Sequence, residues 1–489
     1  MPSQQPRTFM WRAIGAVALT IGFYALAVVI IALLWYGAYF QLTHGSRSPG
    51  RYIFFCLFAT ALILSGLVPR RDKFIAPGDL ITEDEQSRLF KEIRAIASAV
   101  GQDMPHEVYL TPEFNAWVSQ RGGRGIWGGR KMMGLGLPLL SALTVSQFRA
   151  VLAHEFGHFH AGDTKLGPVI YRTRDAISRT VEGLSGSRSL LQIPFVLYGK
   201  MYLRITQGVS RQQEYEADRI AAALAGSDAL AEGLERIHKL GPAYTVYWQN
   251  EFMPLLAAGY YAPLLEGFNH FCEDPRVRAL SDRTLEQART SGRAGAYDTH
   301  PSLSERVESI RAMARPTERR DPDPASRLIE RLPQEEKISV EIHLRRYATR
   351  RLTDVEWDNV ADKVYLQQWD NLIRERGSWL AGVKPASLPD VVKDLGPLAA
   401  SYLNVIGRMP SSEAFQNVVT MCIGTSLALQ LSKMGWELNQ RPAFGFIMRK
   451  DGKEIAPFSI LPRLATGDLS AEDWLQQCRD YGISDAPLG

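Results

Sequence analysis

The chain has 489 residues, which is long enough for two or three domains and at least one sizeable hydrophobic core. Its formal net charge of +4 is small for this length, and the sequence has no basic stripe interleaved with aromatic residues, so we expect no nucleic-acid partner. The four cysteines (Cys56, Cys272, Cys422 and Cys478) are scattered without a CxxC pair, which argues against a disulfide scaffold and a cysteine-ligated zinc.

Two apolar runs lie near the N-terminus, at residues 13–40 and 52–68, and neither contains a charged residue. About 20 apolar residues are needed to cross the hydrocarbon core of a bilayer. We therefore expect residues 1–70 to be a membrane anchor with two transmembrane helices at about 13–40 and 52–68. A cleaved signal peptide is the alternative, but its apolar region would be shorter and would end at a small-residue cleavage site, which is not seen before Gln41.

Basic residues around these runs predict how the anchor is oriented. More of them flank the outer ends of the two runs than lie in the loop between the runs. The outer group is Arg7, Arg12, Arg70, Arg71 and Lys73, and the loop group is Arg47 and Arg51. The positive-inside bias places both chain ends in the cytoplasm. We expect a multi-pass protein of the cell (inner) membrane with the bulk of the chain on the cytoplasmic side.

After a linker at residues 71–81, the pattern predicts a helix over 82–100 that stops at Gly101. Short strands are expected at 107–111 and 115–118, with a returning strand at 132–140. The glycine-rich stretch 121–131 lacks the GK[ST] ending of a phosphate loop, so we interpret it as a hairpin turn.

Two further helices carry the polar residues of interest. The first is expected to begin at Thr144, which forms a capping box with Gln147, and to stop at Gly162. The second is expected to open at Ser210, which is paired with Gln213 in the same pattern, and to end before Gly226. Between them, residues 190–205 are apolar but interrupted by a proline and two basic residues. We expect this segment to be core, with contact to the membrane as the alternative.

The coarse organisation is a mainly helical α+β chain in three parts after the anchor. Residues 71–315 are expected to form one domain, 316–335 a linker rich in proline and charge, and 336–489 a C-terminal α+β domain of unknown role. The C-terminal part contains a predicted hairpin turned at Asp451–Gly452, and no catalytic constellation is visible there.

The stretch "HEFGH" (154–158) predicts a metal site. On a helix, His154 and His158 are four residues apart and project from one face, with Glu155 on its flank. A catalytic zinc takes three protein ligands and one open position for water. A third histidine six residues after His158 would fit one extended pattern, but that position is Thr164.

A carboxylate from the second helix is therefore the expected third ligand. Glu214 is the preferred candidate, because Asp218 lies four residues later on the same face. Asp218 could then accept a hydrogen bond from the far nitrogen of a ligand histidine and so fix its orientation. Asp163 and Glu216 are the rival ligands. One zinc ion per chain is expected, with Glu155 as the general base.

Three motifs in order, "HEFGH", "SRQQEYEAD" (210–218) and "THPSLSER" (299–306), resemble the membrane zinc metallopeptidases that include HtpX and the CAAX prenyl endopeptidases. The resemblance covers roughly residues 80–315 and implies a zincin-like domain with a small edge-strand sheet. It implies that His154, His158 and Glu214 bind the metal and that His300 and Arg306 lie on the substrate side, where His300 is a candidate oxyanion stabiliser. It also implies that an extended peptide lies along the strand containing Phe114, Asn115, Ala116 and Trp117.

The sequence thus favours a membrane-anchored zinc endopeptidase whose substrates are membrane-associated proteins or peptides. Two alternatives stay open: an inactive zinc scaffold that binds a protein partner, and a zinc hydrolase of non-peptide amides. The intact Glu155 argues against the scaffold, because a structural site needs no base. The sequence gives no expectation for the oligomeric state.

Overall fold

The computed structural model describes residues 5–44, 49–68, 74–121, 129–160, 163–185, 190–292, 300–317, 320–345, 351–443 and 445–488. The chain is a mainly helical α+β protein, as predicted, and it divides into two compact units. Unit 1 comprises residues 1–240 and 283–346, and unit 2 comprises residues 241–282 and 347–489. The domain boundaries expected from the sequence stay a prediction.

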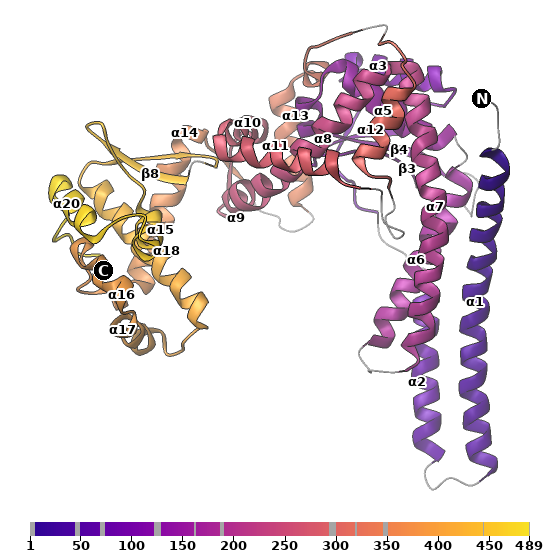
Figure 1. The fold of residues 1–489 in the computed structure, drawn as a ribbon, viewed down its shortest axis with the longest axis horizontal. Coiled ribbons are helices and arrows are strands. Elements are labelled where there is room, and N and C mark those ends of the chain that lie inside the picture. Colours follow the sequence, from indigo (N-terminus) through magenta and orange to yellow (C-terminus); the bar gives the residue numbers. More distant parts are fainter. Residues whose placement is uncertain are drawn as a thin grey trace. The chain divides into compact units, whose positions relative to one another are not determined.

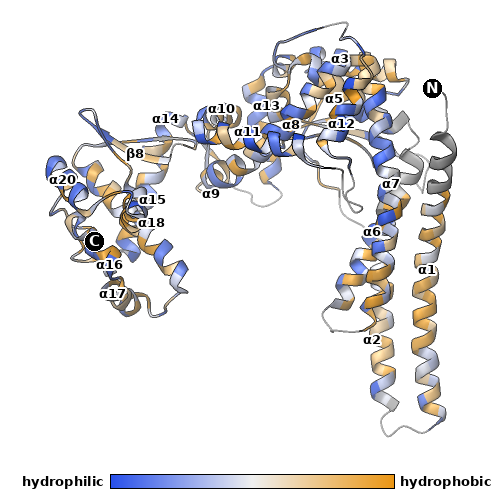
Figure 2. Cartoon of the chain, in the orientation of Figure 1, coloured by the Kyte–Doolittle hydropathy of each residue, from blue (hydrophilic) through white to orange (hydrophobic). Residues whose placement is uncertain are grey.

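Unit 1 begins with the two long apolar helices α1 (Gln5–Thr43) and α2 (Pro49–Leu67), which confirms the predicted pair (Figures 1 and 2). Residues 14–43 and 50–67 are each long and apolar enough to cross a membrane. The helices pack as an antiparallel pair, in which Trp35 Nε1 donates to Thr60 Oγ1 at 3.2 Å.

Four strands form the sheet of unit 1 in the order β1-β2-β4-β3: β1 (Asp79–Ile81), β2 (Glu107–Thr111), β4 (Arg130–Gly136) and β3 (Ala116–Arg121). β4 runs parallel to β2 and antiparallel to β3, with Ala116 opposite Leu135. β3 is an edge strand, since its second edge has no strand partner in the described parts of the chain. Residues 122–128 of the expected hairpin turn lie outside the described residues.

The expected strand 132–140 is wrong in its second half. Residues 137–142 form the short helix α4 (Leu137–Ala142), because Pro138 in its first turn has the φ of a helix and no N–H to give to a ladder. The expected helix at 82–100 begins later, as α3 (Ser87–Val100), since Glu85 accepts hydrogen bonds from the backbone N–H and hydroxyl of Thr82 in a turn before it. Its stop is confirmed, with Gly101 at φ +71°.

The helix carrying the histidines is α5 (Val145–His160), and its predicted capping box is confirmed. Gln147 N–H donates to Thr144 Oγ1 at 3.2 Å, and Thr144 N–H donates to Gln147 Oε1 at 3.1 Å. The predicted stop at Gly162 lies outside the described residues.

α6 (Asp163–Ser185) and α7 (Gln192–Ala225) follow as a long antiparallel pair beside α2 and α1 (Figure 1). The predicted helix start at Ser210 is wrong, because α7 is continuous through it and Ser210 Oγ donates to Thr206 O within the helix. The predicted end before Gly226 is confirmed. Contacts to α1 stabilise the N-terminal half of α7, where Tyr198 Oη donates to Leu19 O at 2.6 Å.

The expectation that residues 190–205 are core holds for one face of α7 only. Phe195 and Tyr202 are fully buried against α1. A stripe on the opposite face is exposed and apolar, and it consists of Leu190, Ile193, Leu197, Met201 and Ile205.

The rest of unit 1 covers the sheet and the two metal-site helices. It consists of α12 (Leu303–Ala312), η2 (Ala325–Leu328), α13 (Leu332–Leu344) and the larger part of α8 (Ser227–Tyr247), together with the end of α11 (Pro275–Thr290). α13 packs on β1 and β2, and α12 packs on α7.

Unit 2 is built around the helix α18 (Ser412–Lys433) and a three-stranded sheet, β7 (Glu437–Arg441), β8 (Gly445–Lys450) and β9 (Lys453–Ile455). α18 is apolar enough to be a third candidate span, but more than half of it is buried inside the chain, so we assign it to the core. The predicted hairpin turn is confirmed, with Asp451 at φ +49° and Gly452 at φ +76°.

The remaining elements of unit 2 are short. They are η1 (Trp248–Phe252), α9 (Met253–Ala257), β5 (Tyr260–Tyr261), α10 (Leu264–Glu273), β6 (Thr353–Asp354), α14 (Trp357–Val360), η3 (Ala361–Leu366), α15 (Gln367–Arg376), η4 (Ser378–Leu380), η5 (Pro385–Ser387), α16 (Leu388–Lys393), α17 (Gly396–Ile406), η6 (Pro457–Ser459), α19 (Ile460–Thr466) and α20 (Ala471–Tyr481).

Candidate metal centre

The centre lies where α5 and α7 cross at close range. A Cβ atom at Gly157 of α5 would lie only 3.0 Å from Ala217 Cα of α7, so the two backbones meet at this point. Residues on either side of the crossing face one another. His154 and His158 of α5 consequently meet Glu214 of α7.

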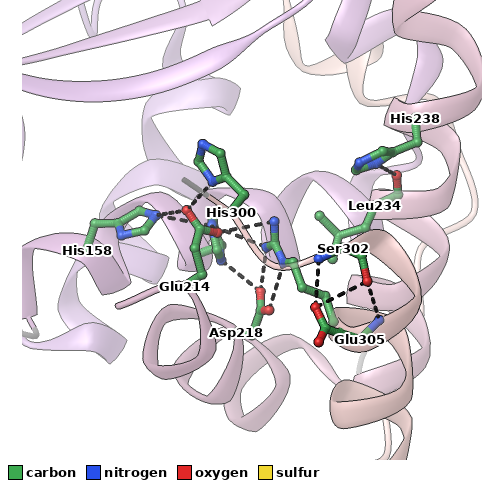
Figure 3. Close-up of polar contacts among 10 residues, drawn as sticks. His158, Glu214, Asp218, Leu234, His238, His300, Ser302 and Glu305 are labelled. Carbon is green, nitrogen blue, oxygen red and sulfur yellow. Dashed lines mark hydrogen bonds and ion pairs between the residues drawn. The ribbon is translucent and has the colours of Figure 1, made fainter. Parts of the chain in front are cut away.

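The three side chains converge on one point, as Figure 3 shows for His158 and Glu214. The two Nε2 atoms of His154 and His158 lie 3.2 Å apart, and Glu214 Oε2 lies 3.5 Å from His154 Nε2. His158 Nε2 lies 3.9 Å from Glu214 Oε1. Ligand atoms about 2.0–2.1 Å from a tetrahedral zinc would be about 3.3 Å from one another. The His, His and carboxylate set therefore fits a zinc ion, with the fourth position left for water.

Behind the ligands, Asp218 and Arg306 form a buried pair. Asp218 Oδ1 lies 3.0 Å from Nδ1 of His154, where the sequence predicts it. Arg306 donates to Asp218 through Nε and Nη2 at 2.9 and 2.7 Å, and its Nη1 lies 3.2 Å from Glu214 Oε2. Arg306 is only 7% exposed. Its guanidinium thus supports the ligands from behind.

His300 approaches Glu214 from the opposite side. Its Nδ1 donates to Glu214 Oε1 at 2.8 Å, while most of its ring is exposed (Figure 3). The residue is held just ahead of α12, whose start is fixed by a capping box between Ser302 and Glu305.

The surroundings set the protonation of the metal-free centre. Burial opposes a charge on His154, but hydrogen bonds to Asp218 and Glu214 outweigh it and raise the pKa of His154 to about 9. Burial also opposes ionisation of Glu214 and Asp218, yet their His154, His300 and Arg306 partners lower the pKa of both carboxyls. Glu155 differs, because burial raises its pKa above the usual range.

A cavity of about 320 Å³ opens in front of the three ligands. Glu155, His300 and Arg306 line it, and so do Phe114, Asn115 and Ala116 at the start of the edge strand β3. Trp117, predicted with them, lies outside the lining, and its ring packs on Gly134 of β4. One wall is apolar and consists of Leu139, Val151, Leu230, Leu234 and Ile237.

His238 of α8 lines the same cavity and was missed by sequence reasoning. Its Nδ1 donates to Leu234 O at 2.9 Å, so Nε2 of the neutral ring is an acceptor. Burial, above all other effects, lowers the pKa of His238 and favours this neutral form. A single histidine in a helix without a motif gives no sequence signal, and only its spacing of four from Leu234 places it on the apolar face.

The rival ligands do not join the cluster among the described side chains. Glu216 pairs with Arg219, whose Nε donates to it at 3.0 Å. The side chain of Asp163 is outside the described residues.

Comparison with known proteins agrees with this geometry. Residues 83–314 match Peptidase family M48. This region of the chain is therefore similar to the M48 peptidases. The match includes His154, His158 and Glu214, and also the segment of His300 and Arg306.

Three relatives illustrate the similarity of this chain to proteins called HtpX. A Protease HtpX homolog of Paraburkholderia phytofirmans is 24% identical over 48% of this chain and 77% of its own length. Another, of Thiobacillus denitrificans, is 28% identical over 46% of this chain and 71% of its own. Protease HtpX of Xylella fastidiosa is 27% identical over 47% of this chain and 74% of its own.

No solved structure matches the chain. The similarity to Peptidase family M48 and to proteins called HtpX, together with two helices long and apolar enough to cross a membrane, supports a membrane metallopeptidase of the HtpX/Ste24 type. The resemblance seen in the three sequence motifs is thereby confirmed.

Proposed function

We propose that the chain is a membrane-anchored zinc metalloendopeptidase that cleaves membrane-associated proteins or peptides, in their quality control or processing. The observation that carries this proposal is the convergence of His154, His158 and Glu214 beside Glu155, in a cavity that reaches an unpaired strand edge.

A bound zinc would supply Lewis acidity that lowers the pKa of water in the site toward neutrality. Glu155 would take a proton from the attacking water and return it to the leaving amine. Its burial supports this role, because a carboxyl with a raised pKa holds and releases a proton near neutral pH more readily than an exposed one.

The other polar residues have supporting roles in this proposal. His300 lines the cavity and holds Glu214, and we keep it as the candidate donor to the developing oxyanion. Arg306 and Asp218 would position the ligands, since both are buried next to them. Arg306 also lines the cavity, and we keep it as the candidate substrate contact that the resemblance implies.

Substrate would bind as an extra strand. Among the described residues no strand pairs with the outer edge of β3, and Phe114, Asn115 and Ala116, just before and at its first residue, lie at the cavity. Backbone pairing of an extended peptide there would give affinity with little dependence on its sequence. We further propose that the catalytic side faces the cytoplasm from the inner membrane, as the flanking basic residues indicate.

The decisive experiment measures zinc content and casein cleavage for the detergent-purified chain and for Glu155→Gln. We expect one zinc in both, and cleavage reduced at least 100-fold by the substitution. Glu216→Gln is the matched control, because Glu216 lies outside the cluster, and it should retain both. Zinc in all three proteins with no casein cleavage in any of them would favour the alternative, an inactive zinc scaffold for a protein partner.

A further inference from the structure

A second cavity, of about 540 Å³, lies between α6 and α7, away from the metal centre. Its apolar lining includes Ile177, Val181 and Phe195, and its basic lining consists of Arg174 and Lys200. The proposed peptidase function uses none of these side chains.

The end of α2 fixes the height of this cavity relative to a membrane. α2 ends at Leu67, and Arg179 Nε of α6 donates to Gly66 O at 3.1 Å, so Arg179 lies level with the end of the apolar run of α2, which we take as the edge of the hydrocarbon layer. Arg174 is five residues earlier in α6, about 7.5 Å further toward the peptidase domain. The headgroup layer on each side of a bilayer is about 5–8 Å thick. By this placement, Arg174 lies at the level of the lipid headgroups.

Lys200 lies at a similar height. The hydroxyl of Thr20 in α1 is 3.4 Å from Thr173 Oγ1 of α6 and 3.1 Å from Tyr202 Oη of α7, so these residues share one level. Lys200 is two residues from Tyr202, or about 3 Å along the helix. The two cations thus lie at one end of the cavity, next to the headgroup layer.

The apolar end of the cavity points the other way. Val181 follows Arg179 in α6, and Phe195 precedes Tyr202 by seven residues in α7, so both lie near the hydrocarbon edge. The cavity is consequently amphipathic along the membrane normal.

Neither cation has a carboxylate partner among the described side chains. Arg174 Nη2 donates to Thr206 Oγ1 at 2.9 Å, while its buried Nε has no hydrogen-bond partner. In the described parts of the chain no carboxylate forms an ion pair with Arg174 or Lys200. Asp175, which also lines the cavity, pairs with Arg179.

We propose that this cavity binds one anionic phospholipid, with its phosphate at Arg174 and Lys200 and an acyl chain against Ile177 and Val181. The amphipathic order of the lining matches a molecule with a charged head and an apolar chain. Anionic lipids enrich the cytoplasmic leaflet, the side on which the flanking basic residues place the peptidase domain. The site is independent of the proposed peptidase activity.

The test is native mass spectrometry of the full chain in detergent, titrated with dioleoylphosphatidylglycerol or with the zwitterionic dioleoylphosphatidylcholine. We expect one tightly held phosphatidylglycerol and at least tenfold weaker retention of phosphatidylcholine. Lys200→Gln should weaken phosphatidylglycerol binding about fivefold, and adding Arg174→Gln should weaken it further. Lys200 is exposed, so its substitution should not disturb folding. Glycerol phosphate in excess should not displace the lipid, because it lacks the acyl chain.

Arg204→Gln is the matched control, since Arg204 is an exposed cation of α7 outside the cavity. We expect it to change phosphatidylglycerol binding less than twofold. Equal losses for Lys200→Gln and Arg204→Gln would show diffuse attraction to the basic surface and overturn the proposal. Equal retention of both lipids, or displacement by glycerol phosphate alone, would also overturn it.

Discussion

Arg306 supports the metal ligands through contacts with Asp218, Glu214 and His154. Its guanidinium contacts Asp218 at two atoms, Glu214 at 3.2 Å and His154 Nε2 at 3.5 Å. In the metal-free protein it offsets the negative charge of two buried carboxylates. A planar fork suits this task better than a lysine ammonium would.

We therefore expect Arg306→Gln to lower the free energy of unfolding of the metal-free protein by roughly 3–5 kcal/mol, because it leaves buried carboxylates without their partner. Zinc affinity should fall about 10- to 100-fold, since the ligands lose their orientation. Urea unfolding with and without zinc measures both. Arg311→Gln on the same helix is the control, because Arg311 forms only a half-exposed pair with Glu235, and it should cost about 1 kcal/mol or less.

His154 makes zinc binding depend on pH. Its pKa of about 9 in the metal-free protein lies above the ordinary value of 6.5, so at pH 7 the ring is protonated and must release a proton to bind zinc. Calorimetry in buffers with different ionisation enthalpies should show about one proton released per zinc at pH 7, and progressively fewer as pH passes 9. No release at pH 7 would contradict a protonated His154.

The same group contributes to stability with a definite sign. Because the pKa of His154 is higher in the folded than in the unfolded protein, protonation of the ring stabilises the folded state. This contribution is complete below pH 6.5 and is lost as the pH rises through about 9. The metal-free protein should therefore melt at a lower temperature at pH 9.5 than at pH 6.5. His154→Gln removes the proton site and should flatten this difference.

At the level of elements, the crossing of α5 and α7 decides the ligand geometry. Gly157 sits at the contact, 3.0 Å from Ala217 Cα for a hypothetical Cβ. The sequence predicts the histidine pair from its spacing alone, but it does not show that glycine between them sets the helix separation.

We expect Gly157→Leu to push the two helices apart, because its side chain would collide with α7. The free energy of unfolding should fall by about 1–3 kcal/mol, and tight zinc binding should be abolished. Zinc titration and thermal melting measure the two effects. Gly183→Leu is the control, because Gly183 is an exposed helical glycine of α6 with no atom within 4 Å of a built Cβ. It should be neutral or slightly stabilising. Equal losses in both variants would mean that the crossing is not the cause.

The sequence predicted those features of the fold that depend on residues close together in the chain. The capping box of Thr144 and Gln147 and the stop at Gly101 are confirmed because each depends on neighbours in the chain. The same reasoning failed at Ser210, where packing of Tyr198 and Tyr202 on α1 extends α7 through a local start signal. The partners of His300 and Arg306 also required the fold, since 86 and 88 residues separate them from Glu214 and Asp218.

At the scale of the whole molecule, chain order does not match the compact units. Residues 241–282 belong with 347–489, and 283–346 return to the first unit. The pairing of β5 with β6 joins residues 260–261 to 353–354 inside unit 2. Such contacts leave no mark in hydrophobic periodicity, so the sequence could not predict this interleaving.

The orientation of the anchor is testable on the intact chain. If the positive-inside bias holds, a green fluorescent protein fused after Gly489 should fluoresce, and an alkaline phosphatase fused there should be inactive. Active phosphatase would place the C-terminus in the periplasm and reverse the assignment. A phosphatase inserted in the loop near Arg47 is the positive control and should be active.

Because α7 is continuous, it sets the distance between the bilayer and the metal centre. Tyr202, which the placement used for the lipid proposal puts at headgroup level, and Glu214, in the metal centre, are twelve residues apart on one unbroken helix, or about 18 Å at 1.5 Å per residue. An extended peptide covers that distance with about five or six residues at about 3.3 Å each. A substrate anchored in the same membrane would then be cut at least about five or six residues from its last membrane-embedded residue, whatever its sequence. The membrane-bound products of different substrates would therefore keep a remnant of similar length.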